Sequence, residues 1–256
     1  MSRKNIIFSL TLCIQCFFVH QLFGQTKESR HWEHAIRVGI NVGGTTPIPL
    51  PAEIRKIESF TTGLNPILGI RSTRWFEPDG KWGITSGFTI EHKGMKESAQ
   101  VKYWYTNLKV GEGDKRGEFE GTFSGFNETR IKNGYFTLPA MATYRLSSIW
   151  TFHAGGFFSW MHTSKFTGIA DDGYIREGGP TGDIINVTSA EFDFSKDLNT
   201  IDAGLLVGAD WKFTRKLSAT GEFSWGFIPI FPSDFKGVTY KMYNLYLGLG
   251  LSYKLF

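Results

Sequence analysis

Eight charged residues lie inside segments in which every second side chain is apolar. Four are positive and four negative: Arg37, Arg71, Glu91, Arg145, Asp202, Asp210, Glu222 and Lys254. All eight occupy the polar parity of their segments, so a pleated strand would point them away from the apolar side chains. Because an isolated buried charge is costly, we expect these residues to pair in a narrow interior. The pattern predicts a structural network of ion pairs; a gated path for ions or protons is the alternative, since buried charges in membranes are functional candidates.

Hydrolytic chemistry would need a nucleophile, a histidine base and a carboxylate that orients the base. His162 lies near Ser159 and Ser164 at the end of one alternating segment. His153 and His162 have opposite parities in that segment, so they do not converge with a carboxylate. The sequence has no nucleophile-elbow or zinc-type histidine motif. We therefore expect no enzymatic activity and no catalytic residue.

The sequence indicates no cofactor or metal site. The segment 163–199 is rich in carboxylates: Asp171, Asp172, Glu177, Asp183, Glu191, Asp193 and Asp197 stand against Lys165, Arg176 and Lys196. Clustered carboxylates suit Ca²⁺, but the spacing matches no known calcium loop, so a solvated acidic surface is the preferred interpretation.

The first 24 residues have the layout of a secretory signal peptide. Arg3 and Lys4 precede an apolar run, and the segment ends at Gly24, after which we expect cleavage. Both cysteines, Cys13 and Cys16, lie in this segment, so residues 25–256 would be free of thiols. A lipoprotein is disfavoured because no small residue precedes either cysteine. The net charge of +4 falls to +2 without Arg3 and Lys4, too little to suggest a nucleic-acid partner.

Residues 25–256 form one predicted domain, because no linker or change of composition divides them. Alternation of apolar residues predicts eight strands: about His34–Gly44, Leu64–Phe76, Lys81–His92, Tyr135–Leu146, Trp150–His162, Thr200–Phe213, Leu217–Phe227 and Tyr243–Phe256. In the last of these, Leu245, Leu247 and Leu249 share one face while Gly248 and Ser252 lie on the other. Pro139 implies a local kink or bulge in its strand.

The connectors between the predicted strands alternate in length. They are long from Thr45, Lys93, Thr163 and Ile228, and short at Glu77, Ser147 and Thr214. This asymmetry is typical of a transmembrane β-barrel with short periplasmic turns and long extracellular loops. Gln100–Val110 is expected to extend the adjoining strands above the bilayer as a hairpin, and Gly111–Gly134 to be a polar, glycine-rich loop. We therefore predict an all-β, eight-stranded antiparallel up-and-down barrel; a secreted lipocalin-like barrel, with its apolar face inward, is the rival.

Several short motifs resemble the porin-family, PorT-like outer-membrane β-barrel proteins of Bacteroidota. They are Val38-Gly39-Ile40-Asn41, Tyr135-Phe136-Thr137-Leu138-Pro139, Tyr144-Arg145-Leu146, Gly155-Gly156-Phe157-Phe158, Asp202-Ala203-Gly204, Gly208-Ala209 and the aromatic C-terminus. The resemblance covers essentially all of residues 25–256. It implies a Gram-negative outer-membrane location, and it permits a role in a protein-export machine. One departure is that Phe256 has the inward parity, whereas the signal read by the barrel-assembly machinery normally aligns its final aromatic residue with the apolar face.

An eight-stranded barrel has an interior just wide enough for side chains to fill. We therefore expect a plugged lumen and a structural or interaction role exerted through the extracellular loops. The alternatives are a small porin that passes solutes or ions, and a barrel component of a secretion machine. The partners expected from this interpretation are outer-membrane lipids and lipopolysaccharide, the barrel-assembly machinery during insertion, and secretion-system or cell-surface proteins.

Overall fold

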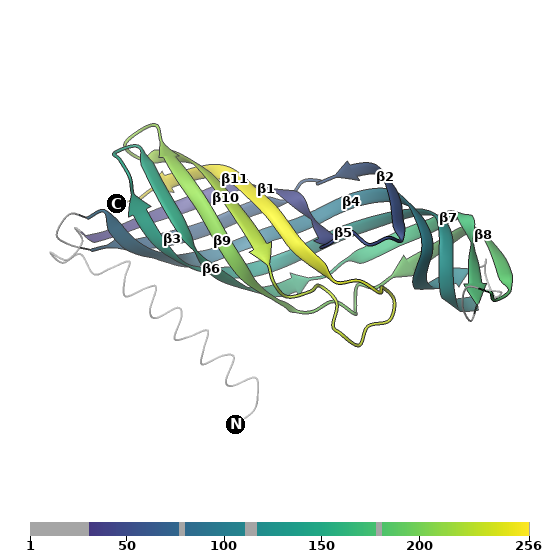
Figure 1. The fold of residues 1–256 in the computed structure, drawn as a ribbon. Coiled ribbons are helices and arrows are strands. Elements are labelled where there is room, and N and C mark those ends of the chain that lie inside the picture. The colour runs from purple at the N-terminus through teal and green to yellow at the C-terminus, as the bar shows by residue number, and fades with distance from the viewer. Residues whose placement is uncertain (1–30, 77–79, 111–116, 178–180, 256) are drawn as a thin grey trace, which may run out of the picture.

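The computed structural model describes residues 31–76, 80–110, 117–177 and 181–255. Within them the chain forms eleven strands (Figure 1): β1 (Trp32–Pro47), β2 (Ile54–Thr61), β3 (Pro66–Trp75), β4 (Trp82–Val110), β5 (Gly117–Arg145), β6 (Trp150–Thr163), β7 (Phe166–Glu177), β8 (Ile184–Asp193), β9 (Ile201–Lys212), β10 (Leu217–Gly226) and β11 (Met242–Lys254). The expected signal peptide, residues 1–24, lies outside the described residues, as does Phe256. None of the described residues belongs to a helix with the length and apolar character needed to cross a membrane.

Eight of the strands close into a ring. Antiparallel pairs join β1, β3, β4, β5, β6, β9, β10 and β11 in that order, and β11 pairs with β1. These eight overlap the eight strands predicted from alternation. Pro139 interrupts the β4–β5 ladder, which resumes at Thr137 in the same register, so no bulge forms there.

The apolar residues of the ring face outward. On β1, Val38 and Ile40 are 47% and 43% exposed, whereas Arg37 and Asn41 on the opposite face are buried. The other ring strands show the same arrangement, which is the reverse of that in a soluble protein: their Leu, Ile, Val, Phe and Trp side chains are exposed on the outside of the ring. A soluble protein does not leave so large a continuous apolar surface in water. The lipocalin-like rival, which requires an apolar interior, does not fit this arrangement.

Exposed aromatic residues cluster toward both ends of the apolar band. Trp82, Trp150, Trp211, Phe213 and Tyr253 lie near the short turns, while Phe158, Trp160, Trp225 and Phe227 lie toward the other end. Amphipathic rings favour the two interfaces of a bilayer, so the spacing of these groups fits a membrane-embedded band.

The strands β4 and β5 continue far beyond the ring. They pair from Trp82↔Tyr144 to Val110↔Gly117 as a hairpin of two 29-residue strands. The predicted extension through Gln100–Val110 is therefore present. The prediction of a loop over Gly111–Gly134 was wrong from Gly117 onward, because pairing with β4 and β7 satisfies the backbone of this polar, glycine-containing segment.

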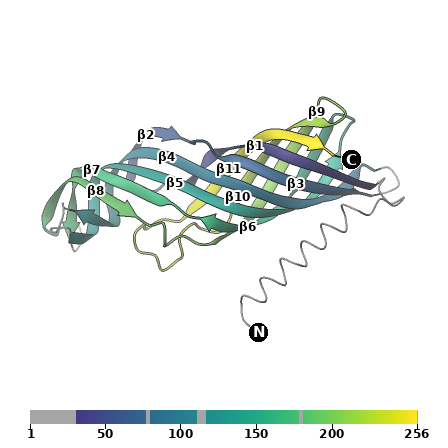
Figure 2. The same cartoon turned by 180° about the vertical axis from the view of Figure 1, so that it is seen from behind.

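Three strands, β2, β7 and β8, lie where long loops were predicted. The strand β7 pairs with β5, and β8 pairs with β7 and with the far end of β4. These pairings make β4, β5, β7 and β8 a second, smaller ring at the end opposite the C-terminus (Figure 1). β2 pairs with β4 at the base of this extension (Figure 2). We call this part the distal lobe: β2, residues 93–110 and 117–134 of β4 and β5, β7, β8 and the segment 228–241.

The distal lobe has an apolar core of its own. Its buried members include Met95, Trp104, Phe123, Ile131, Phe166, Ile175, Val187, Phe192, Phe194, Ile230, Phe231 and Val238. Trp104 packs edge-on against Phe192 at 5.6 Å between ring centroids. The same core reaches Tyr135 and Met242 at the mouth of the eight-stranded ring. Apolar packing thus closes the end of the lumen at which the distal lobe stands.

Candidate functional site: the charge network of the lumen

Glu222 is the centre of the first group of buried charges. Its strand, β10, lies across the lumen from β3, and β11 and β1 lie between them in the ring order. The carboxylate contacts Arg37 at 2.6 Å and Arg71 at 2.7 Å, and Arg37 also donates to Thr220. All three charged side chains are almost completely buried. One carboxylate thus holds two guanidinium groups from β1 and β3, and the three side chains cross the interior.

His153 extends this group to the opposite wall. From β6 it places one ring nitrogen 3.8 Å from Glu222 and the other 3.9 Å from Asp210 on β9. Asp210 is the more open of the two carboxylates and borders the cavity at the short-turn end. The histidine therefore bridges a buried carboxylate and a half-open one.

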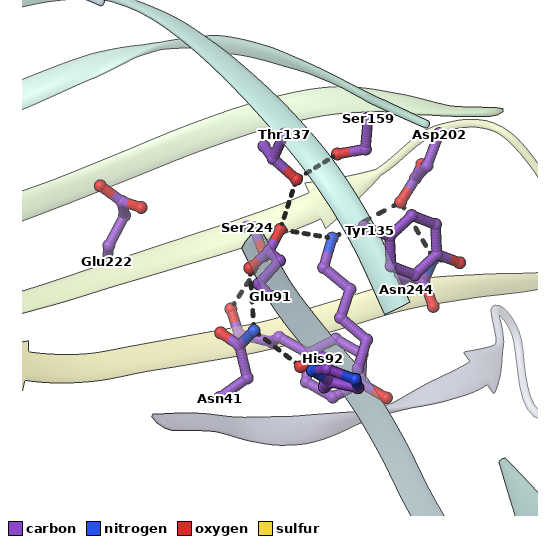
Figure 3. A network of polar contacts seen from close by, with 12 residues as sticks. Asn41, Glu91, His92, Tyr135, Thr137, Ser159, Asp202, Glu222, Ser224 and Asn244 are labelled. Atoms are coloured by element: carbon purple, nitrogen blue, oxygen red, sulfur yellow. Dashed lines mark hydrogen bonds and ion pairs between the residues drawn. The ribbon is translucent and has the colours of Figure 1, made fainter. Parts of the chain in front are cut away.

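A second group surrounds Glu91, nearer the distal lobe. Asn41 donates to Glu91 at 2.8 Å and Thr137 donates at 2.7 Å (Figure 3). Lys93, whose side chain is only 1% exposed, lies 3.6 Å from Glu91 and 3.7 Å from Asp202. A single ammonium group between two carboxylates therefore joins β4 to β9 across the lumen.

Asp202 is also held from the β11 side. Asn244 donates to Asp202 at 2.9 Å and contacts the Tyr135 hydroxyl at 3.3 Å (Figure 3). The Lys93 ammonium lies 4.8 Å from the centre of the Phe157 ring and 5.2 Å from that of Tyr135. A charge so placed gains from the electron-rich faces of both rings. This layer is the boundary between the polar lumen and the apolar core of the distal lobe.

A third, more open group lies at the short-turn rim. Glu33 contacts Lys254 at 2.8 Å and Arg145 at 3.6 Å. The Arg145 guanidinium also stacks 3.9 Å from the centre of the Trp75 ring. These side chains are one quarter to two fifths exposed, so water screens their interaction.

All eight charged residues singled out in the sequence therefore face the interior, in three groups. The sequence analysis missed two further charged members, Glu33 and Lys93. It also did not assign His153 to the network of ion pairs. Glu33 and Lys93 each fall one residue outside a predicted strand, and both have the inward parity. Extending the strands by one residue would have found them.

The space left inside the lumen is small. A cavity of about 80 Å³ opens at the short-turn end among the rim and Glu222 groups, and one of about 20 Å³ separates the Glu222 and Glu91 groups. A water molecule needs roughly 10–15 Å³ by this measure, so the first cavity has room for about five to eight waters and the second for one or two. The arrangement is a packed polar interior.

His162, the histidine close to Ser159 and Ser164 in the sequence, lies outside this network. His162 stacks on Phe136 at 4.5 Å on the outside of the wall, and its Nδ1 contacts Thr163. Ser159 is buried on the inside, hydrogen bonded to Thr137. The serine and the histidine therefore lie on opposite faces of β6.

The acidic segment 163–199 folds mainly as the β7–β8 hairpin. Within the described part of the chain, no three His, Cys, Asp or Glu side chains converge as metal ligands would. Asp193 has a local role instead: the Ser195 hydroxyl and backbone N–H form hydrogen bonds that lower the pKa of this carboxyl.

A closed antiparallel ring with apolar side chains outside and paired charges inside is the architecture of a transmembrane β-barrel, because closure satisfies every strand edge. Residues 23–232 match the family described as outer membrane protein beta-barrel domain, and the chain belongs to this family. Fold and family together place the protein in the outer membrane.

Three solved structures with a similar chain path are distant in sequence. Ail of Yersinia pestis is 10% identical, with a TM-score of 0.38 over 88% of this chain and 99% of that one. The outer membrane protease OmpT from Escherichia coli is 12% identical, with a TM-score of 0.34 over 91% and 99%. The translocator domain of the autotransporter NalP from Neisseria meningitidis is 10% identical, with a TM-score of 0.25 over 98% of both chains. No curated protein sequence matches the chain.

Proposed function

We propose that this protein is a plugged, non-enzymatic outer-membrane barrel that acts as an interaction protein through its distal lobe. The main support for this proposal is that two successive layers of side chains fill the lumen. The first is formed by the Glu222 and Glu91 groups, and the second is the apolar core of the distal lobe above them. The charged residues are structural in this proposal: they neutralise one another and brace opposite walls. Residues 1–24 are a cleaved leader, and the distal lobe faces the cell exterior.

A small porin is the main alternative, and current measurements separate it from the proposal. Purified protein is inserted into planar bilayers, and insertion is verified independently by protease digestion of the distal lobe. We expect no unitary currents, because ions would need to displace both the paired side chains and the apolar core. A porin of known conductance, inserted by the same procedure, shows that the assay detects channels. Steady unitary currents from this protein would overturn the proposal.

The resemblance to PorT-like proteins of Bacteroidota supports a second candidate, a barrel component of a secretion machine. The distal lobe offers such a partner a folded surface rather than separate loops. Cross-linking in intact cells, followed by purification of the barrel, tests this role. Repeated recovery of secretion components would favour it, and recovery of lipopolysaccharide and assembly factors alone would count against it.

A further inference from the structure

Four cationic residues gather on the outer face of the distal lobe where it meets the barrel. Lys96 on β4 stands directly opposite Arg130 on β5, and the Lys132 N–H donates to the Lys165 carbonyl at 2.9 Å, just before β7. Strand alternation places Lys96, Arg130 and Lys132 on the same outward face, and Lys165 lies next to Lys132 just outside β7. Lys96 and Arg130 are 44% and 49% exposed, and Lys132 and Lys165 are also exposed. Figure 2 shows β4, β5 and β7 side by side at this position.

The described anions nearby do not balance these charges. Glu128 forms ion pairs with both Lys96, at 2.9 Å, and Arg130, at 3.6 Å. Asp193, opposite Thr167 in the β7–β8 ladder, interacts with both Lys165 and Lys196. Lys132, two residues beyond Arg130 on β5, adds a further positive charge to the face. The patch therefore retains an excess of positive charge.

The membrane-facing band ends directly below this patch. Ile90, Phe136 and Trp160 form one row across β4, β5 and β6, facing outward, with His162 stacked on Phe136. Lys132 is four residues above Phe136 on the same strand, which is roughly 13 Å along the strand and less in height because barrel strands tilt. The cations are thus at the height where lipid headgroups meet the edge of the apolar band.

We propose that Lys96, Arg130, Lys132 and Lys165 bind the phosphate groups of a lipopolysaccharide molecule in the outer leaflet, with its acyl chains against Phe136 and Trp160. Lysine and arginine form charge-assisted hydrogen bonds to phosphate oxygens. The apolar row supplies the complementary surface for the chains. This assignment rests on the proposed orientation of the barrel, with the distal lobe outside the cell.

Lipid binding to detergent-solubilised protein tests the site without depending on orientation. The probes are lipid A carrying both phosphates, lipid A from which the phosphates have been removed, and inorganic phosphate as a competitor. The test variant is Arg130→Ala/Lys132→Ala. Two controls remove the same charge elsewhere: Lys236→Ala/Lys241→Ala in the segment 228–241, and Arg215→Ala/Lys216→Ala at a short turn.

We expect the test variant to bind phosphorylated lipid A about thirtyfold more weakly than the wild type, since each of the two basic residues near anionic lipid contributes roughly five- to sixfold. Both controls should retain wild-type affinity. Heat-modified gel mobility verifies that every variant is folded. Equal binding of the two lipid A forms, equal loss in the controls, or displacement of the lipid by equimolar inorganic phosphate would each overturn the assignment. None of these outcomes would affect the absence of unitary currents in planar bilayers. The lipid-binding proposal and the plugged-lumen proposal can therefore fail independently.

Discussion

Glu222→Gln is the most informative single change in the lumen. Glutamine keeps the shape of the side chain but removes the charge that holds Arg37 at 2.6 Å and Arg71 at 2.7 Å. The Glu222 side chain is 9% exposed, so water compensates little for the loss. Removing one partner of a buried ion pair costs about 3–5 kcal/mol. Because the amide oxygen still accepts one hydrogen bond, we expect the free energy of unfolding to fall by about 3 kcal/mol.

The assay is urea unfolding of the barrel in lipid vesicles, followed by tryptophan fluorescence. The matched control is Glu58→Gln, which disrupts an exposed pair with Lys56, whose side chain is 68% exposed. Exposed pairs contribute about 0.2–1 kcal/mol, so the control should barely change stability. A second variant, Arg71→Met/Glu222→Gln, removes one of the stranded cations. It should be at least ~1.5 kcal/mol more stable than the sum of the single changes predicts. Equal small effects of Glu222→Gln and Glu58→Gln would refute the reasoning.

Three further predictions concern other layers. Lys93→Met leaves two buried carboxylates without their shared cation, and should lower the free energy of unfolding by about 3 kcal/mol or more in the same titration; a stability equal to wild type would show that the ammonium is dispensable. Trp104→Ala should cost about 3–5 kcal/mol within the distal lobe alone; limited proteolysis should cut the lobe faster while the barrel keeps its gel mobility, and unchanged cleavage would contradict this. The pKa of Asp193 is lowered in the folded state, so its stabilising effect is present above the ordinary value of 3.8 and lost as the pH falls through the folded value. Amide exchange at Ser195, corrected for its intrinsic pH dependence, should therefore speed up as the pH falls below 3.8 in the wild type, but not in Asp193→Asn.

The ring strands were predictable because the bilayer imposes one apolar face on each of them. In β11, for example, Leu247 and Leu249 meet lipid while Gly248 faces the lumen, so the alternation is readable in the sequence. Inward charges such as Arg37 and Glu222 followed from the same parity. Their individual partners did not, because pairs across the lumen depend on which strands face each other after closure.

The distal lobe was not predictable by the same means, because bulges reset its alternation. Tyr103 adopts a φ of 59° where the β4–β5 register shifts, so the buried positions change from odd, at Val101, to even, at Trp104. Asp172 has a φ of 46° in β7, where the buried positions change from even, at Ala170, to odd, at Ile175. A period-2 search fails across such points. β2 has no clear alternation because nearly all of it is exposed.

Site-directed spin labelling can measure directly which side of the barrel wall meets lipid. Spin labels attached through Leu249→Cys on the outside and Ser252→Cys on the inside of β11 are measured in bilayers against dissolved oxygen and a water-soluble nickel chelate. We expect oxygen to relax the Leu249 label strongly while the chelate does not. The Ser252 label, which borders the cavity at the short-turn end, should show the weaker oxygen effect. Strong relaxation of the Leu249 label by the chelate, with the Ser252 label in the oxygen-rich environment, would contradict this prediction.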